Sequence, residues 1–389
     1  MACTIGQRTP QAEAAAYVLA RHAVTALLDE ARLTPKTGLV DMRGSGNHDD
    51  MDLSMLEASA ESLETAFFDM ALAGWGRMPD AALRRQIGAI GREGERVMMK
   101  TTGGVNTHRG AIWALGLMVT ACAMHEGQAF THDICGKAAS LAKIGDEACP
   151  KRFSKGKYVT ARYKVPGARE EAQGGFPHVT RLALPQLAAS RHRGSLEPEA
   201  RIDALLAVMT SLADTCVLSR GGMPALAAMQ KGARAVLDMG GIGTEAGKRA
   251  FARLEDVMRE TRASPGGAAD LLAATLFLDR AAHPITGDKN MQNITLKYPG
   301  RAAAGKKALA GVVGSGDMEA LFEPDTADRL DVSIITSTDG SAARWERLFA
   351  RLSDAAPLPA GRLVIHAFGA TPGVARWRIE QVFEEARHE

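Results

Sequence analysis

The stretch from Thr101 to Gly110 combines residue types that can hold an anion at the start of a helix. It reads Thr-Thr-Gly-Gly-Val-Asn-Thr-His-Arg-Gly, and an apolar run follows it directly. Glycines let a backbone approach a ligand closely, and the N–H groups of a first helical turn are free to bind an anion. Asn106 or Thr107 can cap that helix. We therefore predict a phosphate-binding loop rather than an ordinary helix start. Its members are Gly103, Gly104, Asn106, Thr107, His108 and Arg109.

An acidic cluster precedes this loop in the chain. His48, Asp49, Asp50 and Asp52 lie almost side by side in the sequence. Oxygen ligands of this kind hold Mg²⁺, which keeps several waters and bridges to substrate phosphates. The alternative is an acidic helix N-terminus, where aspartate is favoured electrostatically. Because Asp41 and Lys36 stand nearby, the sequence favours a metal and phosphate site. The expected metal ligands are His48, Asp50 and Asp52, and the expected phosphate ligand is Lys36.

Other glycine pairs precede predicted helices, and two of these pairs have charged or polar neighbours. They are candidate sites, whereas Gly240-Gly241 is expected to be only a turn. No segment fits the pattern G-x-x-x-x-G-K-[ST], so the chain is not a P-loop protein. The candidate residues are Asp214, Arg220, Ser264, Gly266, Gly267 and Asp270.

The roles of two further groups of residues cannot be assigned from the residue types alone. Arg169 and Glu171 belong to a charged stretch that forms either an exposed ion-pair turn or part of a site, and on a helix they point in different directions. Ser315 stands between two glycines and between two predicted strands, as in a hairpin turn. No Ser/His/Asp set and no G-x-S-x-G pattern accompany it, so it is not expected to be an activated nucleophile.

Helical periodicity fills the chain as far as residue 282, and alternating strand patterns then take over. We predict an all-α domain over residues 1–282, a linker over 283–292 and a small α+β domain over 293–389. The helical patterns cover 10–31, 53–75, 79–99, 111–126, 131–146, 201–218, 222–238, 244–261, 266–282, 341–353 and 372–386. The strand patterns cover 294–298, 309–313, 318–322, 332–338 and 363–367.

The composition excludes several classes of protein. The 389 residues are 46% hydrophobic and carry a formal net charge of +2, which suits a globular protein and offers no field for nucleic acid. The 5 cysteines are scattered without a CxxC pair, so a zinc site or disulfide framework is not expected. No signal peptide or long apolar segment is evident. We expect a cytoplasmic protein that binds neither nucleic acid nor membrane.

Residues 10–282 resemble the triphosphoribosyl-dephospho-coenzyme-A synthases. Their motifs are most similar to those of the malonate decarboxylase branch of this family. Residues 293–389 resemble the malonate decarboxylase acyl carrier subunit, through residues 312–319 and 368–374. The segments that carry the first resemblance are Thr34–Asp41, Gly46–Asp52, Thr102–Gly110, Gly167–Ala172 and Ser264–Asp270.

The first resemblance implies that ATP and 3′-dephospho-coenzyme A react to give a triphosphoribosyl derivative and adenine. A ribose hydroxyl of the coenzyme attacks the anomeric carbon of ATP's ribose. Carboxylates can stabilise the resulting oxocarbenium character and accept the proton. We assign Asp41, Asp50 and Asp52 to the metal or the oxocarbenium ion, and Mg²⁺ to the triphosphate. The candidate bases are Glu171, Asp214 and Asp270, with Arg169, Arg220, Ser264, Gly266 and Gly267 as further substrate ligands.

The second resemblance implies that Ser315 carries a phosphoribosyl-dephospho-coenzyme-A arm. Attachment of that arm belongs to a separate transferase, so malonate decarboxylase subunits and that transferase are the expected partners. Lys155 and Ser219 stand where the synthases are expected to have histidine, and Ala367 stands where the carrier is expected to have aspartate.

Three rival interpretations stay open. An all-α Mg²⁺ enzyme with many carboxylates also fits an ADP-ribosyl hydrolase, and His48-Asp49 fits a metal-dependent phosphohydrolase. In the third interpretation, the helical domain is an inactive scaffold, and only the C-terminal carrier domain is functional.

Overall fold

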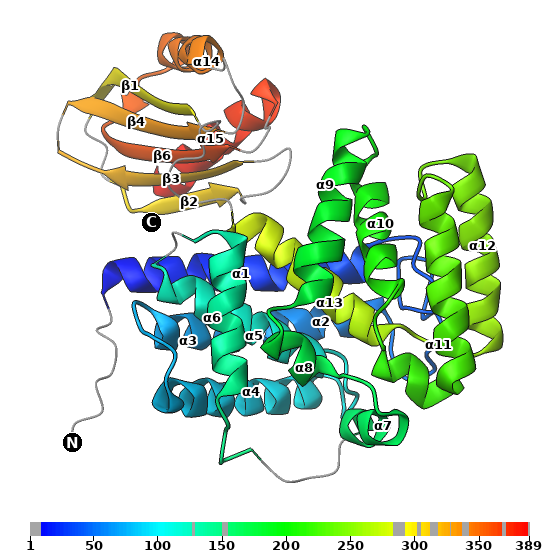
Figure 1. Cartoon of the computed structure of the whole chain (residues 1–389). Coiled ribbons are helices and arrows are strands. Elements are labelled where there is room, and N and C mark those ends of the chain that lie inside the picture. Colours follow the sequence, from blue (N-terminus) through cyan, green and yellow to red (C-terminus); the bar gives the residue numbers. More distant parts are fainter. Residues whose placement is uncertain are drawn as a thin grey trace. The chain divides into compact units, whose positions relative to one another are not determined.

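The computed structural model describes residues 9–126, 129–149, 155–282, 292–301, 305–311, 318–326, 328–336, 342–367 and 371–387. The chain divides into two compact units, Met1–Ile285 and Thr286–Glu389, and each is considered by itself (Figure 1). The predicted linker lies outside the described residues except for Gln292, with which the first strand begins. None of the described helices is long and apolar enough to cross a membrane.

The first unit is built from helices, as predicted. Its α-helices are α1 (Pro10–Arg32), α2 (Leu53–Ser62), α3 (Glu64–Gly74), α4 (Ala81–Thr101), α5 (Arg109–Met124), α6 (Thr131–Lys143), α7 (Lys155–Tyr163), α8 (Ala168–Gln173), α9 (Leu184–His192), α10 (Glu197–Met209), α11 (Thr215–Asp238), α12 (Glu245–Glu260) and α13 (Gly266–Ala281), with one π-helical turn, η1 (Val179–Ala183).

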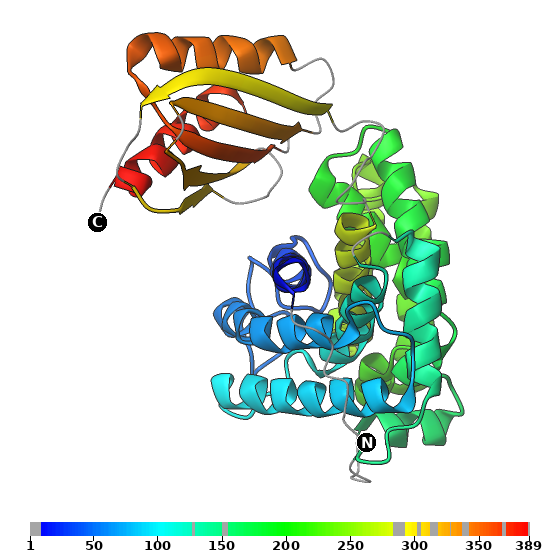
Figure 2. The ribbon, with the colours of Figure 1, turned by 90° about the vertical axis from the view of Figure 1, so that its left-hand side faces the viewer.

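The centre of this unit is formed by α1, α3, α5 and α13. Helix α5 is apolar on all sides and therefore buried along nearly its whole length, as expected for a helix without a polar face. It packs against α1, α3 and α13, and α1 also packs against α3 and α13. Figure 2 shows α1 end-on beside these neighbours. Each fully buried side chain of this core, such as Phe67 or Phe277, stabilises the fold by roughly 1.5–3 kcal/mol. The core thus fixes the N-termini of α5 and α13.

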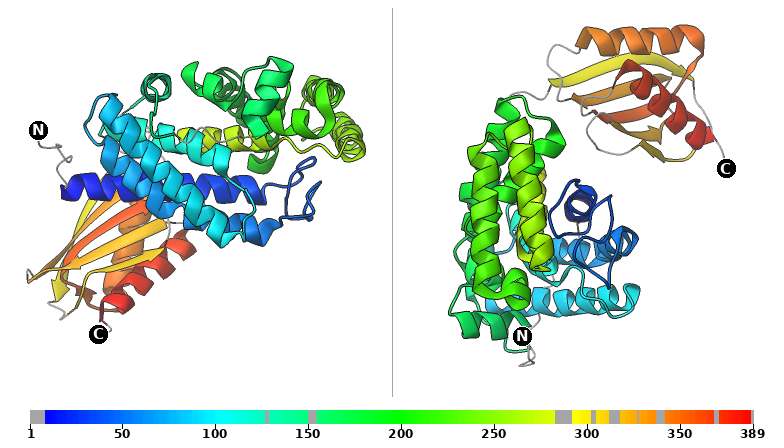
Figure 3. Two further views of the ribbon diagram at one scale, coloured as in Figure 1. Left: turned by 90° about the horizontal axis from the view of Figure 1, so that it is seen from below. Right: turned by 90° about the vertical axis from the view of Figure 1, so that its right-hand side faces the viewer.

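The remaining helices flank this centre. Helices α11 and α12 pack against each other and run side by side in Figure 3. Helix α11 is interrupted at Gly222, whose φ of +63° is left-handed and accessible to glycine without strain. The predicted helix start at residue 222 coincides with this kink.

Several predicted boundaries were wrong. The pattern over 53–75 is two helices, because the chain breaks at Leu63. The pattern over 201–218 joins the end of α10 to the start of α11, although residues 210–214 lie in neither helix. The short elements between residues 155 and 192 were not predicted, because they are too brief to show a clear period.

The second unit is a sheet covered by two helices, which confirms a sheet-and-helix unit in broad terms. The strands are β1 (Gln292–Arg301), β2 (Ala308–Gly311), β3 (Met318–Pro324), β4 (Arg329–Thr336), β5 (Leu358–Pro359) and β6 (Gly361–Ala367), in the order β2-β3-β6-β4-β1-β5. The helices are α14 (Ala342–Ala355) and α15 (Pro372–Arg387). Strand β5 was not predicted, because two residues show no alternation.

Side-chain alternation explains why this sheet has a covered face. Buried and less buried residues alternate along β3 and β4, and the buried set packs against α14 and α15. Strands β4 and β6 are parallel, with α14 in the crossover between them. Ser315 lies outside the described residues. Ala367 is buried at the end of β6, opposite Met318 and Thr336.

Candidate active site

The loop after α1 is organised by Asp41. Its carboxylate accepts hydrogen bonds from the backbone N–H groups of Lys36 and Arg43, at 2.8 Å each, and from Arg43 Nε at 2.9 Å. Asp41 is buried, and Arg43 also pairs with Glu255. Both carboxylate oxygens are therefore engaged within the loop. This differs from the metal or oxocarbenium role that we expected for Asp41, which acts here as the residue that shapes the loop.

Lys36 also points inward rather than toward a ligand. Its Nζ lies 2.6 Å from Glu30 Oε1 and 2.5 Å from the Glu30 carbonyl oxygen. The side chains of Lys36 and Glu30 are only 1% and 8% exposed, so this is a buried ion pair. The predicted phosphate ligand is thus a structural cation in this conformation, because its partner is a buried carboxylate.

Asp270 lies at the junction of several helix ends. Its Oδ2 would be 2.0 Å from a Cβ added at Gly110, so only glycine there lets the carboxylate reach the first turn of α5. The Ala111 N–H donates to this carboxylate. Burial, Glu30 and Asp214 raise the pKa of Asp270 well above its usual range. Asp270 remains half-buried, which leaves it accessible. A carboxylate with a raised pKa in such a place suits a general base.

Asp214 connects the starts of α11 and α13. Its Oδ1 accepts from Cys216 N at 2.8 Å and caps α11, while its Oδ2 accepts from Ala268 N at 2.9 Å. Burial raises the pKa of Asp214, although these N–H donors oppose the shift. Because its oxygens hold two helix N-termini together, Asp214 is better suited to position α13 and Asp270 than to exchange protons with a substrate.

A second group joins the loop of residues 44–50 to α11 and the start of α13. His48 Nε2 lies 2.7 Å from Ser264 Oγ, and His48 Nδ1 lies 3.2 Å from Arg220 Nη2. Arg220 also donates to the Asn47 carbonyl oxygen. Burial, followed by Arg220, lowers the pKa of His48, so its imidazole is neutral at pH 7. The structure thereby brings together three predicted residues from distant segments: His48, Arg220 and Ser264.

The expected metal ligands are not gathered in one place. Asp50 Oδ1 lies 3.6 Å from His48 Nδ1, but Asp52 Oδ1 accepts from Met55 N at 2.8 Å and so caps α2. Within the described part of the chain, no three His, Cys, Asp or Glu side chains are close enough to hold a metal ion. Asp52 therefore follows the alternative interpretation of an acidic helix start. Asp50 is 62% exposed.

The glycine-rich loop is partly turned into the core. Gly103 and Gly104 adopt φ of +62° and +96°, with open space around them, so glycine is required there by conformation. His108, rather than Asn106 or Thr107, is the N-cap residue of α5. Asn106 Oδ1 still accepts from Arg109 N, at 3.3 Å. The prediction of the capping residue was wrong by one or two positions.

His108 is buried, with its Nδ1 2.7 Å from Ser59 Oγ. Ser59 Oγ also lies 2.6 Å from Thr107 Oγ1. Burial lowers the pKa of His108 to about 4, and Lys36 adds to the effect, so the ring is neutral. His108 thus helps to hold the loop on α2, which differs from the exposed phosphate contact that we expected.

Arg109 is the first residue of α5, and Arg169 and Glu171 belong to α8. Arg109 Nε donates to Glu95 Oε1 of α4 at 2.6 Å. Glu171 accepts from the His178 backbone N–H and lies 2.7 Å from His178 Nδ1. Burial lowers the pKa of Arg84 on α4, and charge repulsion from Arg169 on α8 adds to this effect. Glu171 is therefore grouped with His178, whereas Asp214 is among the groups that raise the pKa of Asp270, after burial and Glu30.

Sequence reasoning missed Glu30 and Gly110 as parts of this site. Glu30 follows Ala23 and Leu27 on the apolar stripe of α1, where a lone carboxylate signals a buried partner. Gly110 was taken only as part of a motif, because its closeness to Asp270 depends on the packing of α5 against α13. Ser219, at one of the departures from the family pattern, donates to the Cys216 carbonyl oxygen next to the site.

Comparisons with known proteins found two family matches along the chain. Residues 16–287 match the ATP:dephospho-CoA triphosphoribosyl transferase family, and residues 305–386 match the malonate decarboxylase delta subunit family. A 2-(5''-triphosphoribosyl)-3'-dephosphocoenzyme-A synthase of Klebsiella pneumoniae is 59% identical over 70% of this chain and 97% of its own length. A probable synthase of the same name from Stutzerimonas stutzeri is 56% identical over 69% of this chain and 93% of its own length.

One solved structure is also similar in sequence. It is a chain from a Pseudomonas malonate decarboxylase hetero-tetramer in complex with malonate, 47% identical over 24% of this chain and 97% of that chain, with a TM-score of 0.24. The family match covers most of the chain, and all the residues grouped around Asp270 fall within it. The chain belongs to the ATP:dephospho-CoA triphosphoribosyl transferase family.

Proposed function

We propose that the first unit transfers the triphosphoribosyl group of ATP to 3′-dephospho-coenzyme A and releases adenine, and that Asp270 is its general base. A ribose hydroxyl of the coenzyme attacks C1′ of ATP's ribose, the C1′–N9 bond breaks, and adenine leaves with the bonding electrons and takes up a proton from solvent. The hydroxyl proton passes to the Asp270 carboxylate. The observation that supports this best is the position of Asp270, half-buried at the start of α5 with a raised pKa.

The helix ends around Asp270 suit the phosphates of ATP. The N-terminus of α5 contacts Asp270, and those of α11 and α13 meet at Asp214. The positive ends of helix dipoles favour an anion within the first turn. Arg220 and Ser264, with Gly266 and Gly267 at the start of α13, are the groups that we expect to contact the triphosphate.

The carboxyl groups of Asp214 and Asp270 lie in the same region, and Asp214 raises the pKa of Asp270 after burial and Glu30. Carboxylate charge stabilises the oxocarbenium character that develops when the base departs from ribose. The phosphates then act as a handle, while the broken bond is the one to adenine.

Release of adenine tests this function directly. Purified protein with ATP and 3′-dephospho-coenzyme A should produce adenine, and omission of the coenzyme should stop it. Free ADP-ribose or inorganic phosphate in place of adenine would instead indicate a ribosyl hydrolase or a phosphohydrolase. Absence of any product would leave only a carrier function.

Mg²⁺ is proposed to accompany the triphosphate, held chiefly by phosphate oxygens and by Asp50. When bound, the ion would neutralise phosphate charge. We expect Asp50→Asn to abolish adenine release without unfolding the protein, since Asp50 is exposed and supports no helix. The neighbouring Asp49→Asn variant is the matched control and should stay active. Full activity of Asp50→Asn across a magnesium titration would contradict the metal role of Asp50.

The second unit is proposed to be an acyl carrier that bears the phosphoribosyl-dephospho-coenzyme-A arm on Ser315 and works with malonate decarboxylase subunits. Its match to the delta subunit family supports this role. The chain makes the precursor, and a separate transferase attaches it. We therefore expect no mass increase at Ser315 after incubation with ATP and 3′-dephospho-coenzyme A alone. A covalent adduct on Ser315, absent from Ser315→Ala, would show that the chain loads itself.

A further inference from the structure

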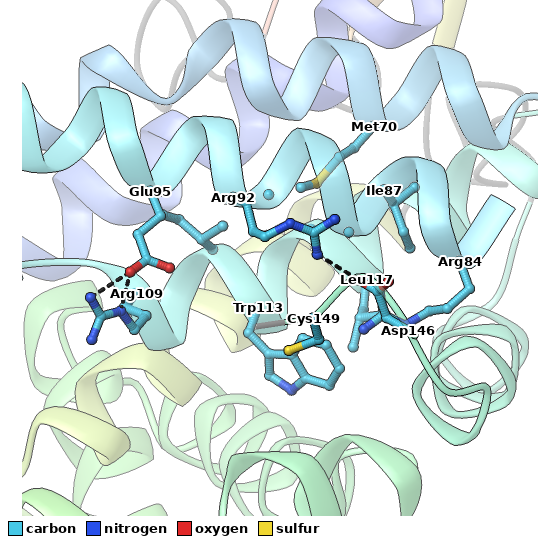
Figure 4. A pocket seen from close by; sticks show the side chains of 14 residues that line it. Met70, Arg84, Ile87, Arg92, Glu95, Arg109, Trp113, Leu117, Asp146 and Cys149 are labelled. Atoms are coloured by element: carbon cyan, nitrogen blue, oxygen red, sulfur yellow. Dashed lines mark hydrogen bonds and ion pairs between the residues drawn. The ribbon is translucent and has the colours of Figure 1, made fainter. Parts of the chain in front are cut away.

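A pocket of about 200 Å³ lies between α4 and α5 and involves residues that the proposed reaction does not use (Figure 4). Its charged lining residues are Arg84, Arg92 and Glu95 from α4, Arg109 from α5 and Asp146 from the loop after α6. Apolar side chains and glycines of both helices form the rest of the wall, together with Met70 of α3 and Cys149 after α6. The pocket is therefore narrow and mostly apolar, with charges concentrated at a few points.

The charges in this pocket do not balance. Arg92 Nη1 lies 2.6 Å from Asp146 Oδ2, and Arg84 Nη1 lies 3.7 Å from the same oxygen. The third guanidinium, that of Arg109, pairs with Glu95. Three guanidinium groups thus face two carboxylates. Arg169 is also close enough to lower the pKa of Arg84.

Arg84 is the least satisfied of these cations. It is 8% exposed, and its buried Nε has no hydrogen-bond partner among the described residues. Leaving a buried donor without a partner is costly, and so is burying a cation whose counter-ion is shared. An anionic ligand that accepted hydrogen bonds from Arg84 would remove both costs.

The arginines are held in place before any ligand arrives. The guanidinium carbon of Arg84 lies 5.3 Å from the centre of the Trp113 ring, and Trp113 Nε1 donates to the Ala168 carbonyl oxygen. A Cβ at Gly88 would lie 2.1 Å from Asp146 Oδ2, so glycine lets Asp146 sit directly against α4. Rigid guanidinium groups of this kind match the geometry of phosphate oxygens.

We propose that this pocket binds a phosphate or diphosphate group of one of the two nucleotide substrates, with Arg84 and Arg92 as its ligands. The proposal rests on the proposed function, in which both substrates carry linked phosphates. Arg109 lines the pocket, and the next residue, Gly110, contacts Asp270. The pocket extends from Arg109 to Leu117, about 12 Å along α5. It therefore receives a part of the substrate that is remote from the reacting hydroxyl.

Steady-state kinetics of Arg92→Gln and Arg84→Gln identify the source of the phosphate. Each lost charged hydrogen bond should raise the KM of one substrate by roughly ten- to a hundredfold, with kcat little changed. An increase for ATP alone indicates its triphosphate, and an increase for 3′-dephospho-coenzyme A alone indicates its diphosphate. Arg96→Gln, on the same helix but paired with Glu93 outside the pocket, is the matched control and should change neither KM.

Calorimetry with inorganic tripolyphosphate and with pyrophosphate provides a readout that does not depend on catalysis. The wild-type protein should bind at least one of them, and Arg92→Gln should bind it roughly tenfold or more weakly. Arg92 is half-buried, so this variant is expected to fold even if Arg84→Gln does not. Adenine release with both KM values and polyphosphate binding unchanged in folded Arg92→Gln would overturn the pocket proposal. Loss of polyphosphate binding in this variant without any adenine release by the wild type would support the pocket while contradicting the proposed function.

Discussion

Asp270→Asn is expected to lower the rate of adenine release by about 10²–10⁴-fold, the range typical of a lost general base. Asparagine has nearly the same shape, and its amide oxygen can still accept from the Ala111 N–H. Substrate binding and the fold should therefore persist while proton transfer is lost. Adenine release should be followed chromatographically, and ATP binding should be measured separately by calorimetry.

The same variant should be at least as stable as the wild type. Because burial and neighbouring carboxylates raise the pKa of Asp270 in the folded protein, the unfolded chain binds fewer protons between the two pKa values. Stability then falls as pH rises from the unfolded pKa to the folded one, and the ionised Asp270 is unfavourable at neutral pH. Asparagine removes this charge. We expect an unchanged or higher melting temperature at pH 7, with a smaller difference at acidic pH.

The pH profile gives an independent check on Asp270. A general base must be ionised, so the acid limb of the wild-type rate should lie well above the ordinary carboxyl range near ~4. Asp279→Asn, on the same helix but paired with Arg191, is the control and should keep the rate and its pH profile. Wild-type activity in Asp270→Asn would assign the base elsewhere, with Asp214 as the next residue to replace.

Glu30→Gln is expected to destabilise the helical unit by about 3–5 kcal/mol, because it leaves the Lys36 ammonium buried without its carboxylate. The two side chains are almost fully buried, and the 2.6 Å contact is not screened by solvent. Equilibrium denaturation followed by far-ultraviolet circular dichroism measures the loss of stability of this largely helical unit. Glu30 also raises the pKa of Asp270, so the acid limb of any remaining activity should move to lower pH.

A double variant separates the ion pair from the packing around it. Glu30→Gln combined with Lys36→Met removes both charges and keeps most of the volume, so it should recover much of the lost stability. The surface pair of Arg32 with Glu57 provides a matched control, since Arg32→Gln should change stability by only about 0–1 kcal/mol. Wild-type stability of Glu30→Gln alone would mean that Lys36 readily finds another partner.

The sequence correctly predicted the helices and strands in which apolar residues recur at a regular helical or strand spacing. Helices α1 and α12 and strands β3 and β4 show this period clearly, and the structure places them within a few residues of their predicted ranges. The prediction was wrong where the helical pattern continues on both sides of a short break, as at Leu63 and over residues 210–214. Apolar residues on both sides of such a break continue the pattern, so periodicity cannot locate it.

The site was predictable as a set of segments but not as a set of contacts. The resemblance grouped the segments that hold His48, Gly110 and Asp270. In the structure, His48 lies near Ser264, and Gly110 lies against Asp270. The inward turn of Lys36 could not be predicted, because it depends on Glu30 of the preceding helix. The arginine pocket could not be predicted either, because it also depends on tertiary packing. Residues 84, 92 and 146 meet only where α4 packs against the loop after α6.

In the proposed reaction, the bond to adenine breaks while the triphosphate stays intact and moves with the ribose to the coenzyme. The most direct measurement is mass spectrometry of the coenzyme product, with adenine and phosphate quantified in the same reaction. We predict one adenine per triphosphoribosyl-dephospho-coenzyme A, no released phosphate, and formation of both products slowed by about 10²–10⁴-fold with Asp270→Asn. Formation of adenine without the triphosphoribosyl adduct, or release of phosphate in proportion to turnover, would contradict the account.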